Sequence, residues 1–204
     1  MLTHERIEYC KTAIESFLSQ SYENKELIIV NSGGLKYFEL VENFIDYQNV
    51  DNIRHVFFLK NQQTTIGELR NKGLEHALGD YITVWDDDDF YSKTRVESQV
   101  YWIEKEKADF VMFKNFIVSI KNRTRISCKN PNGLEPSLFF KKNHVLYPKL
   151  MKSEDTLFIQ QMIDKGFKKY IIDNCEKDYI YNFHGSNTCS HAHFMSIINH
   201  WGKK

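Results

Sequence analysis

The chain has 204 residues, of which 42% are hydrophobic and 14% aromatic, and its 27 lysines and arginines balance 27 aspartates and glutamates. This composition is typical of a globular protein, and the length suits one domain with a sizeable core. Zero net charge gives no case for non-specific nucleic-acid binding. No apolar run has the length of a membrane span or of a signal-peptide core, so we expect a soluble, cytoplasmic protein.

Helical and extended patterns alternate through the first ninety residues. Apolar residues recur at helical spacing in the first segment, which Thr3 is suited to cap, and Gly79 is placed to end the third helix. Helices are predicted at residues 3–20, around 40–45 and at 67–78. Strands are predicted at residues 26–30, 53–59 and 81–85. This order predicts an α/β fold with a Rossmann-type parallel sheet and helices on both faces.

The second half is richer in short strands. Strands are predicted at residues 109–114, 116–120, 124–127, 137–140, 169–172 and 179–182. Helices are predicted at residues 94–106, from Ser153 to Gly166 and at 192–201. A hairpin turn is expected at Lys121-Asn122-Arg123. We expect this half to be a smaller antiparallel extension that forms a second wall over the rim of the sheet.

Four consecutive aspartates, Asp86 to Asp89, follow the third predicted strand. Four like charges repel one another, and carboxylate oxygens suit Mg²⁺ or Mn²⁺, which usually also hold substrate phosphates. A solvated acidic loop or an acidic helix start is the alternative. The polar residues Asn31-Ser32-Gly33 follow an earlier strand. Both segments fall at the carboxyl ends of strands, where parallel sheets bind ligands, so the pattern is typical of a nucleotide site.

Several segments, in this order, together resemble family 2 glycosyltransferases. They are Ala13 to Tyr22 with Glu26 to Val30, Gly67 to Leu74, Gly79 to Ile82, the DxD-like Trp85 to Asp89, the "ED"-like Ser153-Glu154-Asp155, and Tyr181 to Asn187. The resemblance covers essentially the whole chain. It implies a GT-A fold and a nucleotide-sugar-dependent, usually inverting enzyme. Residues 1–90 would be the nucleotide-sugar-binding half and residues 91–204 the acceptor-binding and catalytic half of one domain, residues 1–204.

The resemblance implies a role for each matching position. Asp86 would approach the donor ribose and Asp88 would bind Mn²⁺ or Mg²⁺. Asp87 is grouped with the nucleotide-sugar contacts as a supporting charge, and Asp89 is also a supporting charge. Asp155 would be the catalytic base.

Two further positions carry implied roles. His184 would be a second ligand of the metal or a contact to the diphosphate, and Arg70 would lie near the nucleotide. The residue types alone also allow structural alternatives. His184 would then be a hydrogen-bonded surface histidine, and Arg70 would be a solvated charge on a helix. A neutral imidazole could ligate Mn²⁺, whereas a protonated one could pair with phosphate.

Two segments depart from the family pattern. Leu2-Thr3-His4-Glu5-Arg6 stands where the family runs from its first strand into a Thr-Tyr-Asn-like turn, with that strand cut down to Met1-Leu2. Asn31-Ser32 stands where the family has paired aspartates, one of which contacts uracil. We count Leu2, Thr3, His4 and Ser32 among the nucleotide-sugar contacts, with a UDP-sugar as the expected donor.

Asp155 falls in the first turn of the helix that follows Ser153, where the helix dipole favours an ionised carboxylate. Such a carboxylate can take the proton of an acceptor hydroxyl, although a good helix start needs the same residue types. The expected function is metal-dependent, inverting sugar transfer to a hydroxyl of a glycan, lipid-linked or protein-linked acceptor. The alternative is a degenerate protein that binds nucleotide or sugar without turnover. A nucleotidyltransferase is disfavoured because the chain has no glycine-rich phosphate loop with a lysine.

Overall fold

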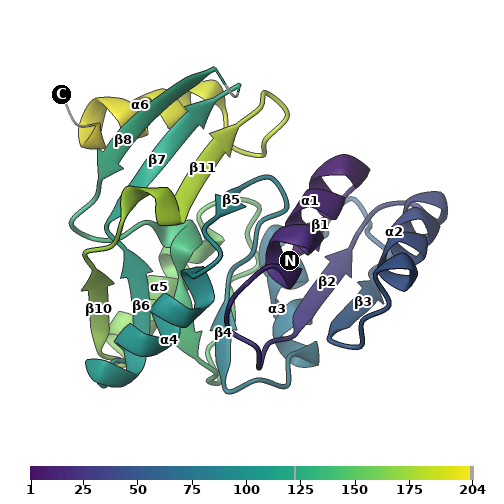
Figure 1. The fold of residues 1–204 in the computed structure, drawn as a ribbon, viewed down its shortest axis with the longest axis horizontal. Coiled ribbons are helices and arrows are strands. Elements are labelled where there is room, and N and C mark those ends of the chain that lie inside the picture. Colours follow the sequence, from purple (N-terminus) through teal and green to yellow (C-terminus); the bar gives the residue numbers. More distant parts are fainter. Residues whose placement is uncertain (122, 203–204) are drawn as a thin grey trace.

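The computed structural model describes residues 1–121 and 123–202, so Asn122 of the predicted hairpin turn lies outside the described residues. Figure 1 shows how the helices and strands are arranged. The helices are α1 (Ile7–Leu18), α2 (Leu35–Gln48), α3 (Ile66–His76), α4 (Arg95–Lys105), α5 (Glu154–Asp164) and α6 (His191–Trp201), with 3₁₀ turns at Glu135–Ser137 and Glu176–Asp178. The strands are β1 (Leu2–Thr3), β2 (Leu27–Asn31), β3 (Ile53–Phe57), β4 (Tyr81–Thr83), β5 (Phe90–Tyr91), β6 (Phe110–Phe113), β7 (Asn115–Ile120), β8 (Thr124–Lys129), β9 (Phe139–Lys141), β10 (Lys169–Ile172) and β11 (Tyr179–Phe183).

The strands form three hydrogen-bonded groups. The first, β1-β2-β3, is parallel, as predicted. The second has the order β10-β6-β9-β4, in which β9 runs antiparallel to both of its neighbours. An isolated parallel bridge between Leu2 and Asp86 links the first group to the residues that follow β4. The predicted strand at residues 81–85 therefore joins the parallel strands only through this bridge.

Helices cover both faces of this central layer, which confirms the predicted α/β architecture. Side chains alternate along a strand, so Leu27 and Ile29 of β2 pack on the α1 and α2 side, whereas Ile28 and Val30 pack against α3. Strand β6 repeats this alternation between α4 and α5. Burial on both faces explains why these strands are continuously apolar.

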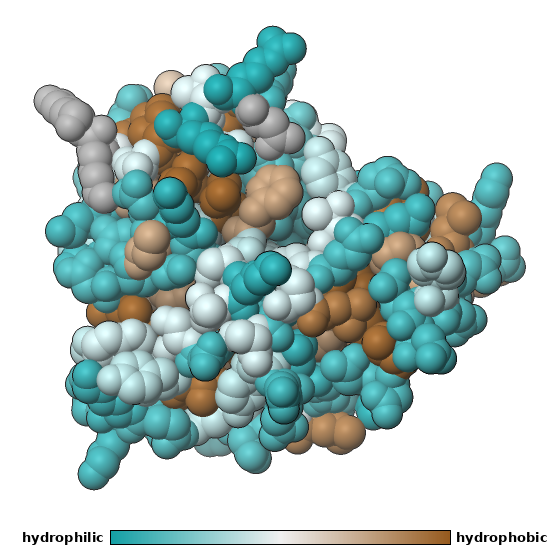
Figure 2. Space-filling model, viewed as in Figure 1, coloured by the Kyte–Doolittle hydropathy of each residue, from teal (hydrophilic) through white to brown (hydrophobic). Residues whose placement is uncertain are grey.

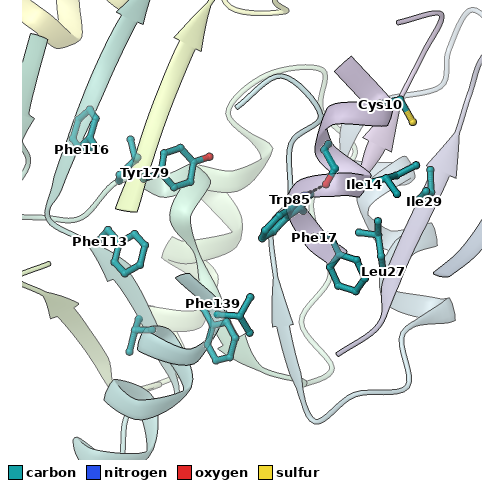
Figure 3. Close-up of a cluster of buried hydrophobic side chains, with 14 of the residues drawn as sticks. Cys10, Ile14, Phe17, Leu27, Ile29, Trp85, Phe113, Phe116, Phe139 and Tyr179 are labelled. Atoms are coloured by element: carbon teal, nitrogen blue, oxygen red, sulfur yellow. Dashed lines mark hydrogen bonds between the residues drawn. The ribbon is translucent and has the colours of Figure 1, made fainter. Parts of the chain in front are cut away.

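Trp85 is a large core residue whose polar group has a partner. In Figure 3 the indole of Trp85 lies beside the ring of Phe17, which it meets edge-on, and its N–H donates to the carbonyl oxygen of Ala13 at 3.1 Å. Trp85 immediately precedes the four aspartates. This buried ring, 3% exposed, therefore fixes the point at which the acidic run leaves the core.

The third group, β5-β11-β7-β8, extends the molecule beside the rim (Figure 1). The pairs β7–β8 and β5–β11 are antiparallel as predicted, whereas β11 pairs with β7 in parallel, so the extension is mixed rather than antiparallel throughout. Helix α6 covers this group through Phe194, which is fully buried. The end of β11 carries His184 toward the aspartate run.

Several predicted boundaries need correction. Thr3 does not cap the first helix: it lies in β1, its hydroxyl contacts Tyr37, and α1 begins at Ile7. Helix α3 ends at His76 rather than at Leu78, and the Gly79 amide donates to Glu26 instead. Ser153 precedes α5 but its side chain makes no capping hydrogen bond. Tyr37 and Glu26 are the tertiary partners that compete with local capping at the first two positions, and Ser153 is in a left-handed conformation at φ 62°.

A cavity of about 520 Å³ lies where β2 and β4 face each other without pairing. Apolar side chains from both sides line it, among them Leu27, Ile28 and Ile82. Apolar residues reach the surface over β2 in Figure 2. Within residues 1–121 and 123–202, no helix is both long and apolar enough to cross a membrane.

Candidate active site

The aspartate run is held at the carboxyl ends of the central strands by β1. Leu2 pairs with Val30 of β2 on one side and bridges to Asp86 on the other. The phenol of Tyr91 donates to the carbonyl oxygen of Asp86 and lies 2.8 Å from its amide nitrogen. The four carboxylates therefore start from a fixed backbone rather than from a free acidic loop.

Two of the four aspartates point inward. Asp87 accepts a hydrogen bond from the Thr3 hydroxyl at 2.9 Å and pairs with Arg6. Asp89 accepts from the Tyr179 hydroxyl at 2.6 Å and from the Asn182 amide at 2.8 Å. Both residues are 3% exposed. Burial raises the pKa of Asp87 to about 7, against the opposing effect of Arg6, and burial together with the other aspartates raises the pKa of Asp89.

Asp88 faces polar groups from two other parts of the chain, the turn before α1 and the loop after β11. Its Oδ2 lies 2.8 Å from Arg6 Nη1, 3.0 Å from His184 Nε2 and 3.2 Å from Asn187 Nδ2. Burial alone would raise the pKa of Asp88, but His184 and Arg6 outweigh burial and lower it. An ionised Asp88 therefore lies within hydrogen-bonding distance of both the Arg6 guanidinium and the His184 imidazole.

Arg70 joins the first aspartate to the start of α5. Its Nη2 lies 3.7 Å from Asp86 Oδ1, and its Nε donates to Glu154 Oε1 at 3.0 Å. Burial would lower the pKa of Arg70, but Asp86, Tyr147 and Glu154 outweigh burial and raise it. Burial raises the pKa of Asp86, against the effect of Arg70. The guanidinium thus connects the "DxD"-like and "ED"-like segments directly.

Helix α3 is positioned for this contact by the loop that precedes α5. The Asn71 side chain donates to the Tyr147 carbonyl at 2.9 Å and accepts from the Tyr147 amide at 2.8 Å. A Cβ at Gly67 would lie 1.8 Å from the Pro148 carbonyl oxygen, so only glycine allows this approach. These contacts give a physical reason for the residue types at positions 67–71.

Asp155 follows Glu154 in the first turn of α5 and is partly exposed. Its Oδ1 accepts a hydrogen bond from the Thr156 amide at 2.8 Å. The Thr156 hydroxyl donates to Glu135, whose pKa is raised by burial and then by Asp155. Asp155 is therefore an accessible carboxylate beside a second acidic group.

The predicted nucleoside contacts gather at the ends of β1 and β2. His4 is exposed, and its Nδ1 lies 2.8 Å from the carbonyl oxygen of Ser32. Thr3 and Ser32 are buried, at 3% and 7% exposure. The side chain of Asn31 accepts from the Gly33 amide and contacts His55, which itself pairs with Glu42. His4 is the member of this set with a side chain open to a ligand.

The residues at Asp88 fit a divalent cation that is shared with a substrate. Within the described part of the chain, no three His, Cys, Asp or Glu side chains form a metal cluster. Asp88 and His184 supply one oxygen and one nitrogen, 3.0 Å apart. Mg²⁺ in phosphate-handling sites typically takes few protein ligands and completes its coordination with phosphate oxygens and water. The pair suits such an ion.

Three residues of this cluster had no assigned role in the sequence analysis: Arg6, Glu154 and Asn187. Arg6 lies 82 residues before Asp88 and carries no local pattern. Glu154 and Asn187 were inside the quoted motifs, so their motif membership was the available signal. Their partners became visible only when the fold brought the segments together.

Known proteins match both the sequence and the fold. The family described as Glycosyl transferase family 2 matches residues 1–164. An uncharacterized glycosyltransferase of Haemophilus influenzae is 41% identical over 93 residues, which are 45% of this chain and 36% of that protein. An uncharacterized glycosyltransferase of Methanocaldococcus jannaschii is 27% identical over 155 residues, which are 72% of this chain and 52% of that protein. The chain thus matches only about half or less of the length of these curated relatives.

Two solved structures resemble nearly the whole chain. S. aureus TarS 1–349 in complex with UDP-GlcNAc has a TM-score of 0.72 at 17% identity, covering 97% of this chain and 62% of that one. The mannosyltransferase PcManGT of Pyrobaculum calidifontis, in complex with GDP-Man and Mn²⁺, has a TM-score of 0.72 at 12% identity, covering 94% and 57%. Likeness at this identity concerns the fold, and it confirms the predicted GT-A-like architecture.

Proposed function

Because the chain belongs to glycosyl transferase family 2, we propose that it transfers a sugar from a nucleotide-diphosphate donor to a hydroxyl group of a glycan, lipid-linked or protein-linked acceptor. One observation carries the proposal: Arg70 connects Asp86, at the end of β4, to Glu154, the residue before Asp155. A donor at the aspartate run and an acceptor at Asp155 would therefore meet on one rim. The nucleotide-sugars bound by TarS and PcManGT support the donor class.

Asp155 is the proposed base. Its partial exposure and its place in the first turn of α5 suit an ionised carboxylate that accepts the proton of the acceptor hydroxyl. The oxygen of that hydroxyl forms a bond to the anomeric carbon while the bond to the diphosphate breaks. In-line displacement of this kind inverts the anomeric centre.

Asp88 and His184 are the proposed ligands of Mn²⁺ or Mg²⁺. When bound, the ion would neutralise the charge of the departing diphosphate. Asp86 is proposed to face the ribose, while Arg70 fixes its carboxylate. Asp87, with both oxygens engaged by Thr3 and Arg6, would act through Arg6 rather than on the ligand itself.

The nucleoside end of the site is the part that departs most from the family pattern. His4 is proposed to contact the base or ribose, and the buried Ser32 to shape the pocket from behind, while Leu2 and Thr3 hold the backbone of the turn. A UDP-sugar is the proposed donor, reacting in the cytoplasm. The neutral Asn31-Ser32 pair motivates a second candidate, a protein that binds nucleotide or sugar without turnover.

A panel of nucleotide-sugars with Mn²⁺ and with EDTA separates these functions. Hydrolysis or transfer with one donor, lost in EDTA and reduced about 10²–10⁴-fold by Asp155→Asn, is the expected result. Asp164→Asn, at the exposed far end of α5, is the matched control and should keep full activity. Binding of UDP without turnover of any donor would favour the second candidate, and absence of both would contradict the proposal.

A further inference from the structure

We propose that Arg6 is an internal competitor of the divalent cation: its guanidinium occupies the Asp88 carboxylate in the metal-free protein and leaves that carboxylate when the ion binds. This inference rests on the proposed function, because it assigns a regulator to the same cation site. It gives Arg6 a role that none of the sequence motifs implied.

Contact geometry places the guanidinium on the two groups that would bind the ion. Arg6 Nη1 lies 2.8 Å from Asp88 Oδ2 and 3.4 Å from His184 Nε2. The Asp88 oxygen and the His184 nitrogen are 3.0 Å from each other. One nitrogen of Arg6 therefore contacts both proposed ligands. An ion bound by both would need the space that this nitrogen occupies, and its charge would repel the guanidinium at short range.

Arg6 has a second partner that allows it to release the first. Its Nη2 pairs with Asp87, whose side chain is 1% exposed and is also held by the Thr3 hydroxyl. The Asp88 side chain is more open, at 14% exposed, and Arg6 itself is 28% exposed. The ion pair with Asp87 can thus anchor the guanidinium while the ion pair with Asp88 opens toward solvent.

The movement requires only the side chain of Arg6. Arg6 stands immediately before α1, and its carbonyl oxygen accepts a hydrogen bond from the Cys10 amide at 3.0 Å, so its backbone stays in place while the guanidinium changes partner. The repulsion between Asp87 and Asp88 explains why a positive group is useful at this site when no ion is bound. Asp87 and Asp88 are adjacent carboxylates, and a guanidinium that neutralises them stabilises the site before an ion arrives.

Direct titration with Mn²⁺, followed by the electron paramagnetic resonance signal of the free ion, tests the proposal. The variant is Arg6→Met together with Asp87→Asn. Because the pKa of Asp87 is about 7, the titration is done at pH 8, where this pair removes one positive and one negative charge and leaves the net charge near Asp88 unchanged. Asparagine can still accept from Thr3. The expected result is about tenfold tighter Mn²⁺ binding than in the wild type, which corresponds to about 1.4 kcal/mol.

A matched charge-pair removal elsewhere provides the control. Lys114 and Asp173 form an ion pair at 3.0 Å in the second half of the chain, and Lys114→Met with Asp173→Asn should leave Mn²⁺ affinity unchanged. Circular dichroism and thermal unfolding establish that each variant is folded. If the Arg6 pair variant does not fold, Arg6→Lys takes its place, because an ammonium cannot reach both carboxylates with two parallel donors. It should tighten Mn²⁺ binding about threefold.

Equal or weaker Mn²⁺ binding in the folded variant overturns the proposal. So does an absence of Mn²⁺ binding at millimolar concentration in every protein tested. In that case turnover of a nucleotide-sugar in EDTA would leave sugar transfer standing without a metal, whereas no turnover under any condition would remove the proposed function as well. The two failures are therefore distinguishable.

Discussion

Two arginines in the site each join a pair of carboxylates, and the surroundings of the two pairs differ. Arg70 lies within α3, and its partners belong to different elements, Asp86 after β4 and Glu154 at the start of α5. Arg6 lies in the turn before α1, and its partners are the neighbours Asp87 and Asp88. Arg70 thus connects the two halves of the chain.

Exposure separates the contact between Arg70 and Glu154 from the contact between Arg6 and Asp88. The side chains of Arg70 and Glu154 are 16% and 6% exposed, whereas those of Arg6 and Asp88 are 28% and 14% exposed. Asp88 retains His184 and Asn187 when Arg6 is removed, while Glu154 loses the hydrogen bond from Arg70 inside the protein. We call the contacts of Arg70 with Asp86 and Glu154 the Arg70 brace, because they hold two elements together. The contact of Arg6 with Asp88 also joins a guanidinium to a carboxylate, but it is the one that we propose exchanges.

Replacing Arg70 tests the brace most severely. Arg70→Met leaves the Glu154 carboxylate buried without its guanidinium, and we expect the free energy of unfolding to fall by about 3–5 kcal/mol. Urea denaturation measures the loss. Arg70→Met with Glu154→Gln should recover part of it, because the uncompensated charge is gone. A loss of only about 1–2 kcal/mol, the range expected for Arg6→Met, would put Arg70 in the same class as Arg6.

Gly67→Ala disturbs the packing of α3, the helix that carries Arg70. The new Cβ would meet the Pro148 carbonyl oxygen at 1.8 Å, so α3 and the loop before α5 must separate. We expect a loss of about 1–3 kcal/mol in unfolding free energy, measured in urea, together with weaker donor binding through displacement of Arg70. Unchanged stability would mean that the loop moves at no cost, and the brace would then not be rigid.

Arg6→Met alone should cost less than Arg70→Met, about 1–2 kcal/mol, because Asp88 and Asp87 both keep other hydrogen bonds. The measurement is the same denaturation series, at low and high salt. A cost equal to that of Arg70→Met would contradict the distinction between the two arginines.

Gly73→Ala provides the smallest effect and the control for Gly67. Gly73 lies inside α3 on the same helix, but a Cβ there would meet Val30 at an ordinary 3.7 Å. Because alanine favours the helix interior, we expect a gain of about 0.5–1 kcal/mol in thermal or urea unfolding. A destabilised Gly73→Ala protein would show that α3 tolerates no substitution, so the Gly67 result would lose its meaning.

The order of elements and the rim of the sheet could be predicted from sequence, because they follow from local periodicity. Burial on both faces makes β2 continuously apolar, and the alternation of such segments with amphipathic helices predicts the layers. Motifs likewise directed attention to Asp86, Asp88, Asp155 and His184. Their proposed roles remain predictions that the experiments above address.

The partners of these residues could not be predicted, because they depend on contacts between distant segments. Thr3 has the residue type of a helix cap, yet Tyr37 and Asp87 take its hydroxyl. Arg6 stands in the segment that departs from the family's first turn, but nothing in that segment implied a role for its side chain. Asp87 and Asp89 read as members of an acidic run until the fold showed both carboxylates turned inward.

Strand β1 has only two residues, yet the alignment of the whole acidic run depends on its register. Leu2 is paired with Val30 and with Asp86, and the next side chain, Thr3, reaches Asp87. Side chains alternate along a strand, so a slip of one residue would turn the Thr3 hydroxyl to the opposite face. Asp87 would then lose the hydrogen bond from the Thr3 hydroxyl, and Asp86 would lose its backbone bridge to Leu2. Amide hydrogen exchange at Leu2 and Thr3 would therefore report the integrity of the catalytic rim from a strand that contributes no proposed catalytic group.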